Sequence, residues 1–188
     1  MRTVRMIVSV FAVALGLAAG MARAANDAET VALFKNAGQS ASYFPKCYAY
    51  AVFPTIGKGG LVVGGAYGKG HVYEKGRLIG ETSMTQVSIG FQMGGEGYSQ
   101  IIFFQDKRAL QEFTSGNFEF SADANAVAIT AGASASAATT GTTAGASGGK
   151  KDAATAGGYY KGMAVFTIAK GGLMYQATIA GQKFSFKP

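Results

Sequence analysis

Residues 57–80, GKGGLVVGGAYGKGHVYEKGRLIG, decide the fold class. Short runs of β-branched and aromatic residues are separated by glycines, and Lys75-Gly76 stands between two such runs as a turn. Strands that recur at spacings of about 8–12 residues are typical of a sandwich or barrel. Glycine inside a strand permits the bulges and corners that a curved sheet needs.

Short β-prone runs separated by glycines continue toward the C-terminus. Residues 85–94, TQVSIGFQMG, alternate polar and apolar side chains with a period of two, and residues 99–105 form a compact apolar run. Both patterns indicate strands. A short helix is predicted directly after residues 99–105, with Asp106 as its N-cap and Gly116 as its stop.

The N-terminal side is predicted to be helical. Residues 27–42 have apolar side chains near the helical period, and the helix either packs on the core or contacts a membrane. Residues 46–52 are predicted to form a second short helix that Pro54 ends. The predicted fold is therefore mainly β with short helices (α+β): a curved antiparallel sheet forming a sandwich or barrel, with the N-terminal helices packed on it.

Residues 1–24 have the organisation of a signal peptide. Arg2 and Arg5 precede an apolar run, and Ala22-Arg23-Ala24 fits a cleavage site. We expect residues 25–188 to form one domain and residues 131–157, which are almost entirely Ala, Gly, Ser and Thr, to be a flexible loop. The expected location is the periplasm or the cell exterior, in peripheral contact with a membrane.

The charge of the chain favours anionic surfaces. The formal net charge is +7, and loss of the three arginines before Ala25 lowers it to +4. A mildly basic domain suits anionic lipid headgroups but carries too little charge to indicate a nucleic-acid partner.

The residues needed for catalysis or metal binding are sparse. His71 and Cys47 are the single histidine and the single cysteine, so a disulfide within the chain is excluded. The spacings of zinc sites and of the G-x-S-x-G elbow are absent from the sequence. We therefore expect no catalytic residue, metal or cofactor. An enzyme that uses Cys47 or His71 is the remaining catalytic alternative.

Several sequence blocks carry a resemblance to a known family. They are AVFPTIGKGG at 51–60 with GGAYGKG at 64–70, SIGFQMGGE at 88–96, and a block between Tyr160 and Gln182. Together they resemble the SYLF domain, also called the Ysc84 actin-binding domain, from about Asp27 to the C-terminus.

The resemblance implies a lipid-binding module. Eukaryotic members bind phosphoinositides and some bind actin, and exported bacterial members are similar in sequence. Ala180 stands where the family often has an acid, and the loop 131–157 is expanded. The resemblance therefore implies the class of ligand and leaves the particular lipid open.

Lysines at glycine corners are the predicted binding residues. We expect them to gather on one side of the sheet and to meet phosphate headgroups, while N-terminal aromatic rings add shallow apolar contact. The predicted function is peripheral phospholipid binding in the cell envelope, and the alternative is a structural or protein-interaction module there. The predicted lipid-binding residues are Lys58, Lys69, Lys75, Arg77, Lys161, Lys170, Phe34 and Phe44.

Overall fold

A computed structural model describes most of the domain. The predicted signal peptide and the predicted loop at 131–157 lie outside the described residues, as does most of the motif at 88–96. The described residues are 25–59, 63–89, 97–121, 124, 126–129, 158–170 and 179–188.

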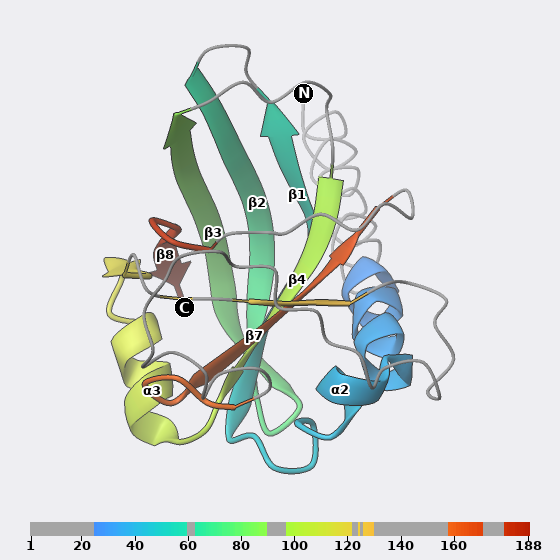
Figure 1. The fold of residues 1–188 in the computed structure, drawn as a ribbon. Helices are drawn as coiled ribbons and strands as arrows, with labels where there is room; N and C mark the ends of the chain where they lie inside the picture. Colours follow the sequence, from blue (N-terminus) through green and yellow to red (C-terminus); the bar gives the residue numbers. More distant parts are fainter. Residues whose placement is uncertain are drawn as a thin grey trace, which may run out of the picture.

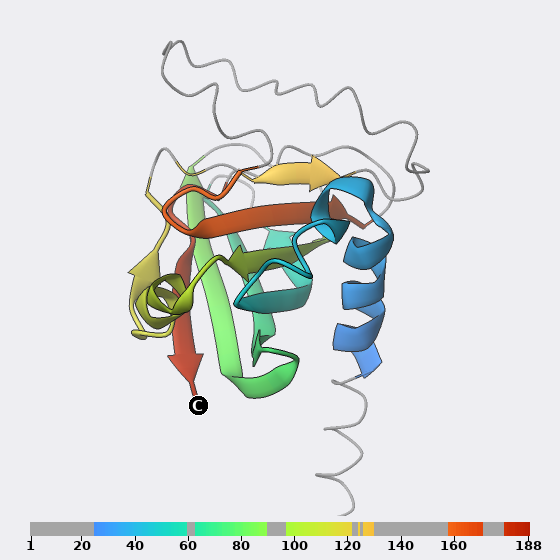
Figure 2. The same cartoon turned by 90° about the horizontal axis from the view of Figure 1, so that it is seen from below.

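One curled, eight-stranded sheet forms the body of the protein (Figures 1 and 2). Its strand order is β5-β8-β3-β2-β1-β4-β7-β6, and neighbours are antiparallel except for β6 and β7, which are parallel. The mainly β prediction is thus confirmed. The strands are β1 Ala49–Gly59, β2 Val63–Glu74, β3 Arg77–Ile89, β4 Gly97–Phe104, β5 Phe118–Glu119, β6 Val127–Ile129, β7 Met163–Ala169 and β8 Lys183–Lys187.

The helices pack against the sheet. Residues 25–36 are helical and are followed by α2, Gly38–Ala41, after a bend at Ala37. The predicted helix after β4 is α3, Lys107–Phe113, and its N-cap Asp106 accepts a hydrogen bond of 2.8 Å from the amide of Ala109. This cap stabilises the first turn of α3, as the sequence indicated.

The predicted helix at 46–52 is wrong. Residues 42–46 form a turn, and β1 then runs through Pro54. The ladder with β2 shifts register between Val52 and Thr55, so Pro54 sits at an irregularity where its missing N–H is tolerated. The carbonyl of Pro54 accepts the hydroxyl of Ser99 at 2.7 Å, which ties the irregular segment to β4.

The two faces of the sheet hold separate apolar clusters. On the inner face of the curl, Ile102 and Phe104 pack with residues that include Phe53 and Phe184. On the outer face, Ile101 packs in a cluster with Phe34, Phe103, Phe166 and Ile168. Strand β4 is therefore buried on both faces along nearly its whole length.

Two buried glutamines cross the inside of the curl. The amides of Gln100 on β4 and Gln182 just before β8 donate to each other at 3.0 and 3.2 Å. Gln182 also donates to the hydroxyl of Tyr98 at 3.1 Å, and both glutamines are fully buried. Three strands separate β4 from β8, so a flat sheet would hold them about 19 Å apart. The amide pair can form only because the sheet curls.

We expect Gln182→Met to destabilise the fold by about 1–3 kcal/mol, because it leaves buried polar atoms of Gln100 and Tyr98 unpaired. Gln100→Met should act similarly. The double variant should lose less than the two single losses combined, because neither amide then lacks its partner. Urea unfolding of all four proteins measures the coupling, and additive losses would contradict a direct amide pair.

Candidate functional site

Strand register brings several segments to one end of the sheet. Ala49 at the start of β1 lies opposite Glu74 of β2 on one side and Phe104 of β4 on the other. Phe104 in turn lies opposite Met163, the first residue of β7. The β2–β3 turn, the segment before β1, the start of α3 and the turn before β7 therefore meet at the same end.

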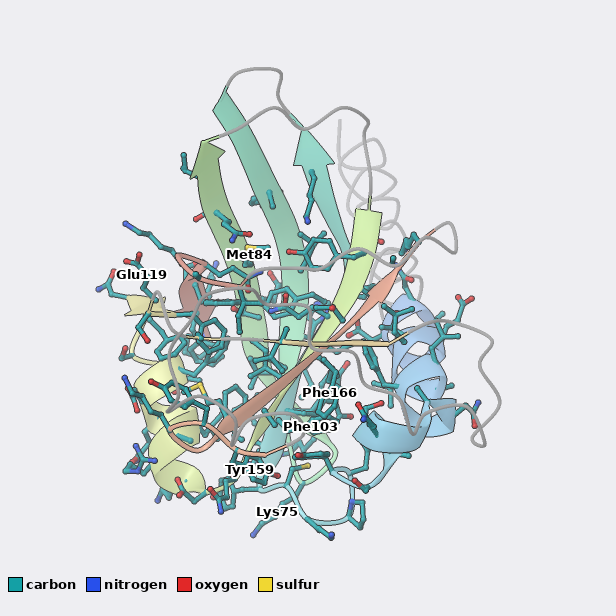
Figure 3. The ribbon with its side chains drawn as sticks, viewed as in Figure 1. Lys75, Met84, Phe103, Glu119, Tyr159 and Phe166 are labelled. Atoms are coloured by element: carbon teal, nitrogen blue, oxygen red, sulfur yellow. The ribbon has the colours of Figure 1, made fainter. Side chains whose placement is uncertain are left out.

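This end of the sheet, called here the basic end, carries six exposed cations. The carboxylates described near it each have a partner: Glu74 accepts the hydroxyl of Tyr48, Asp106 caps α3, and Glu112 lies 3.2 Å from Arg108. Figure 3 shows Lys75 at the lower tip of the molecule. The six cations are Lys46, Lys75, Arg77, Lys107, Arg108 and Lys161.

Two Lys-Gly turns present lysines at the tip of the basic end. Lys75 and Gly76 have φ values of 50° and 80°, and Lys161 and Gly162 have 50° and 82°. Two successive residues with positive φ make a tight hairpin turn of the primed type, which glycine accommodates without strain. The ammonium group of Lys75 lies 5.5 Å from the ring centroid of Tyr48, and that of Lys161 lies 5.3 Å from the ring of Tyr160.

The other three predicted lysines lie elsewhere. Lys69 on β2 is opposite Thr55 on β1, and the ammonium of Lys170 donates to the Thr55 hydroxyl at 2.6 Å. Lys58 lies over the ring of Tyr98, 5.0 Å from its centroid. Lys69 and Lys75 are six residues apart along β2, which is about 20 Å of strand. The six predicted cations therefore do not form one cluster: three lie at the basic end, and Lys58, Lys69 and Lys170 lie nearer the other end of the sheet.

The predicted aromatic contacts are inside the protein. Phe34 has no exposed surface and lies in the outer-face cluster, so its ring is a core element in this conformation. Phe44 is partly buried and packs edge-on against Phe103 and Tyr50. The helix at 25–36 follows the core-packing alternative through Phe34, the large apolar side chain that it buries, whereas Leu33 on its other side is 46% exposed.

Sequence reasoning missed Lys46, Lys107 and Arg108 as members of the basic end. None of them follows the lysine-glycine pattern on which the prediction rested. A signal was available, however, because Lys46 shortly precedes a strand and the other two shortly follow one. In antiparallel neighbours, the start of one strand and the end of the next lie at the same end of the sheet.

A buried carboxylate fastens the N-terminal helix to the sheet. Asp27 is buried, and its Oδ2 accepts the hydroxyl of Tyr73 at 2.7 Å. Nδ1 of His71 lies 2.7 Å from the same oxygen, although no aligned hydrogen bond to Nδ1 occurs among the described residues. Burial, together with the bond to Asp27, raises the pKa of Tyr73, so its phenol stays a donor. We call these three residues the helix clasp.

We expect Tyr73→Phe to lower the free energy of unfolding by about 1.5–3 kcal/mol, because a buried carboxylate loses a hydrogen bond. Tyr67→Phe is the matched control on the same strand, since Tyr67 is half-exposed, and it should change stability by less than about 0.5 kcal/mol. Urea unfolding measures both variants. Equal stability of the two would show that the clasp contributes nothing.

Cys47 is partly buried in an aromatic environment. Its thiol donates to the carbonyl of Phe44 at 3.4 Å, and its neighbours in the outer-face cluster include Tyr43 and Tyr50. Burial raises the pKa of the thiol, while its backbone hydrogen bond opposes this in part. A thiol that resists ionisation is a poor nucleophile. Cys47 and His71 are thus engaged with different partners, which does not favour the catalytic alternative.

We expect native Cys47 to react slowly with iodoacetamide at neutral pH. A raised pKa keeps the neutral thiol, so the rate should rise only at higher pH than for a free cysteine peptide. The same protein in urea serves as the control and should follow the peptide. A native pH profile that coincides with that of the peptide would contradict the prediction.

The described residues show two further features relevant to function. No helix among them is long and apolar enough to cross a membrane. In the same ranges, no group of three or more His, Cys, Asp or Glu side chains is arranged to hold a metal ion.

The fold is that of a small, mainly β domain with a cluster of cations at one end of its sheet. The family model Ysc84, described as a Las17-binding protein actin regulator, matches residues 85–187, which is more than half of the chain. The chain belongs to this family, and the resemblance seen in the sequence is confirmed.

One bacterial relative is also similar. Beta cell expansion factor A of Aeromonas veronii is 27% identical over 167 residues, which cover 84% of this chain and 53% of that protein. The chain therefore spans about half the length of this relative. The Ysc84 family, to which this chain belongs, consists generally of non-catalytic binding modules.

Proposed function

We propose that the protein binds anionic phospholipid membranes peripherally through its basic end. The observation that carries this proposal is the set of six exposed cations gathered at one end of the sheet with three carboxylates near them, one of which pairs with Arg108, so that an excess of three positive charges remains. The proposed setting is the bacterial cell envelope, reached by export. Membership of the Ysc84 family supports a binding role.

The strength of the attraction follows from the number of cations. A lysine or arginine near an anionic membrane surface contributes about 1 kcal/mol. The Debye length at physiological salt is about 8 Å, so the group around Lys69, about 20 Å from Lys75 along the strand, contributes little when the basic end touches lipid. The contact is therefore reversible and sensitive to salt.

Shallow apolar contact adds to the charge. Leu78 is 52% exposed and follows Arg77 at the start of β3. Pro45 is exposed beside Lys46 in the turn before β1. These two side chains, rather than Phe34, are placed to meet the headgroup layer. Deep insertion is not required of a domain held mainly by charge.

The test compares two triple variants that remove the same formal charge. Lys75→Gln/Arg77→Gln/Lys161→Gln neutralises part of the basic end, and Lys58→Gln/Lys69→Gln/Lys170→Gln neutralises the other group. Co-sedimentation with phosphatidylglycerol vesicles at low salt should show about tenfold or greater weakening for the first. The second should stay within about threefold of wild type because its cations lie beyond the screening distance.

Phosphatidylcholine vesicles and a salt series complete the design. Wild-type binding should be weak on neutral vesicles and should fall as salt rises, because the attraction is electrostatic. Equal losses in the two triple variants would assign binding to net charge and reject the basic end as the site. Absence of wild-type binding to anionic vesicles at low salt would reject the function.

A further inference from the structure

A pocket of about 390 Å³, lined mainly by polar residue types, opens on the outer face of β1, β2, β3 and β8, beside the start of the N-terminal helix. The helix covers the β4 and β7 part of this face through Phe34, so the pocket lies on the part that remains uncovered. Its lining comes from five elements and includes residues of the helix clasp.

Strand register arranges the pocket in two rows. In the first row, Lys69 on β2 lies opposite Ser83 on β3, which lies opposite Ser185 on β8. In the second row, two residues further along each strand, His71 lies opposite Glu81, which lies opposite Lys187. Alternate residues of a strand share a face, so all six side chains point to the same side of the sheet.

The first row offers donors to an oxyanion. The hydroxyl oxygens of Ser83 and Ser185 are 2.7 Å apart, so one hydroxyl hydrogen lies between them and the other remains available to a ligand. Lys69 lies beside Ser83 in this row, and Lys187 lies diagonally across, two residues beyond Ser185 on β8. Donors from three strands approach from different directions, which suits a tetrahedral phosphate better than a planar carboxylate.

The second row and the clasp offer acceptors. Glu81 and Asp27 both line the pocket. Oδ1 of Asp27 is buried and has no hydrogen-bond partner among the described residues, so Asp27 contributes its negative charge from behind the pocket surface. The positive charges of Lys69 and Lys187 equal in number the negative charges of Asp27 and Glu81, so the pocket lining is balanced in charge. A balanced site favours a zwitterion over a simple anion.

We propose that this pocket binds a phosphoester with a primary amine, the chemistry of a phosphoethanolamine headgroup. The phosphate lies over the Ser83–Ser185 pair between Lys69 and Lys187. The ammonium donates to Glu81, with the negative charge of Asp27 close behind it. The inference extends the proposed function by naming a headgroup class, and it is tested without a bilayer so that the two can fail separately.

The decisive comparison uses two soluble ligands with the same phosphate and net charge. Glycerophosphoethanolamine has three N–H donors, whereas the quaternary amine of glycerophosphocholine has none. Titration calorimetry on the full protein should show at least fivefold tighter binding of the ethanolamine compound. Glycerol 3-phosphate and ethanolamine alone should each bind more weakly than the whole zwitterion.

Variants locate the two halves of the ligand. Lys69→Gln/Lys187→Gln should weaken glycerophosphoethanolamine at least tenfold. Glu81→Gln should reduce the preference for ethanolamine over choline. Lys183→Gln is the matched control on the same strand face, since Lys183 lies outside the pocket lining and 3.5 Å from Glu119. It should stay within twofold of wild type, as should the triple variant of the basic end.

Vesicles then separate a lipid from a free phosphoester. If the ligand is a lipid headgroup, wild-type binding should increase when phosphatidylethanolamine replaces part of the phosphatidylcholine. The Lys69→Gln/Lys187→Gln variant should not show this increase. Binding of the soluble compound without that gain identifies a free phosphoester-amine, which also supports the pocket. Equal affinity for the two soluble ligands, absence of binding to both, or equal damage from Lys183→Gln would overturn the proposal.

Discussion

The rest of the structure depends on the curl of the sheet, and the contact that spans this curl is the buried amide pair of Gln100 and Gln182. It joins β4 to the residue before β8, although three strands lie between them in the sheet. A buried amide must find partners or lose on the order of 1–3 kcal/mol. The curl brings the two amides into contact, and the phenylalanines of the inner-face cluster pack inside it. Among the described residues, side chains of this cluster pack inside the curl, and both proposed sites lie elsewhere, on the outer face and at the strand ends.

The outer face is divided by the N-terminal helix. Phe34 closes the apolar part over β4 and β7, and burying one such ring contributes about 1.5–3 kcal/mol. Asp27, two turns earlier on the helix, is held by Tyr73 and lies beside His71 of β2. One end of the helix is thus fixed by apolar packing and the other by a buried carboxylate. The pocket lies beside the start of the helix, on the part of the outer face that the helix leaves uncovered.

Local sequence patterns predicted local structure well. Alternation and glycine punctuation indicated the strands, Lys75-Gly76 indicated the hairpin turn, and Asp106 indicated the cap of α3. Each of these depends on contacts between residues close in the chain. The mainly β curved sheet followed from their sum, and it is confirmed.

Features that depend on contacts between residues far apart in the chain could not be predicted from the sequence. Pro54 was expected to end a helix, but an irregular register lets a central strand continue through it. Phe34 was expected at a lipid surface because a helical pattern alone does not show what its apolar side covers. Its partners Phe103 and Phe166 lie on β4 and β7, far along the chain. Likewise, the lysines near glycines separated into two groups because strand register, which the sequence leaves open, sets their positions.

The geometry separates attraction by charge from recognition by chemistry. The row with His71 lies four residues from Lys75 along β2, about 13 Å of strand. The polar layer on each side of a bilayer's hydrocarbon core is about 5–8 Å thick. A domain standing upright on its basic end therefore holds the pocket beyond the headgroups. The domain must tilt toward its outer face for the pocket to meet a headgroup still in the membrane, and such a tilt also brings Lys69 and Lys187 closer to lipid phosphates. Charge at the end and a balanced pocket on the adjoining face thus define two orientations of one domain, and occupation of the pocket selects the tilted one.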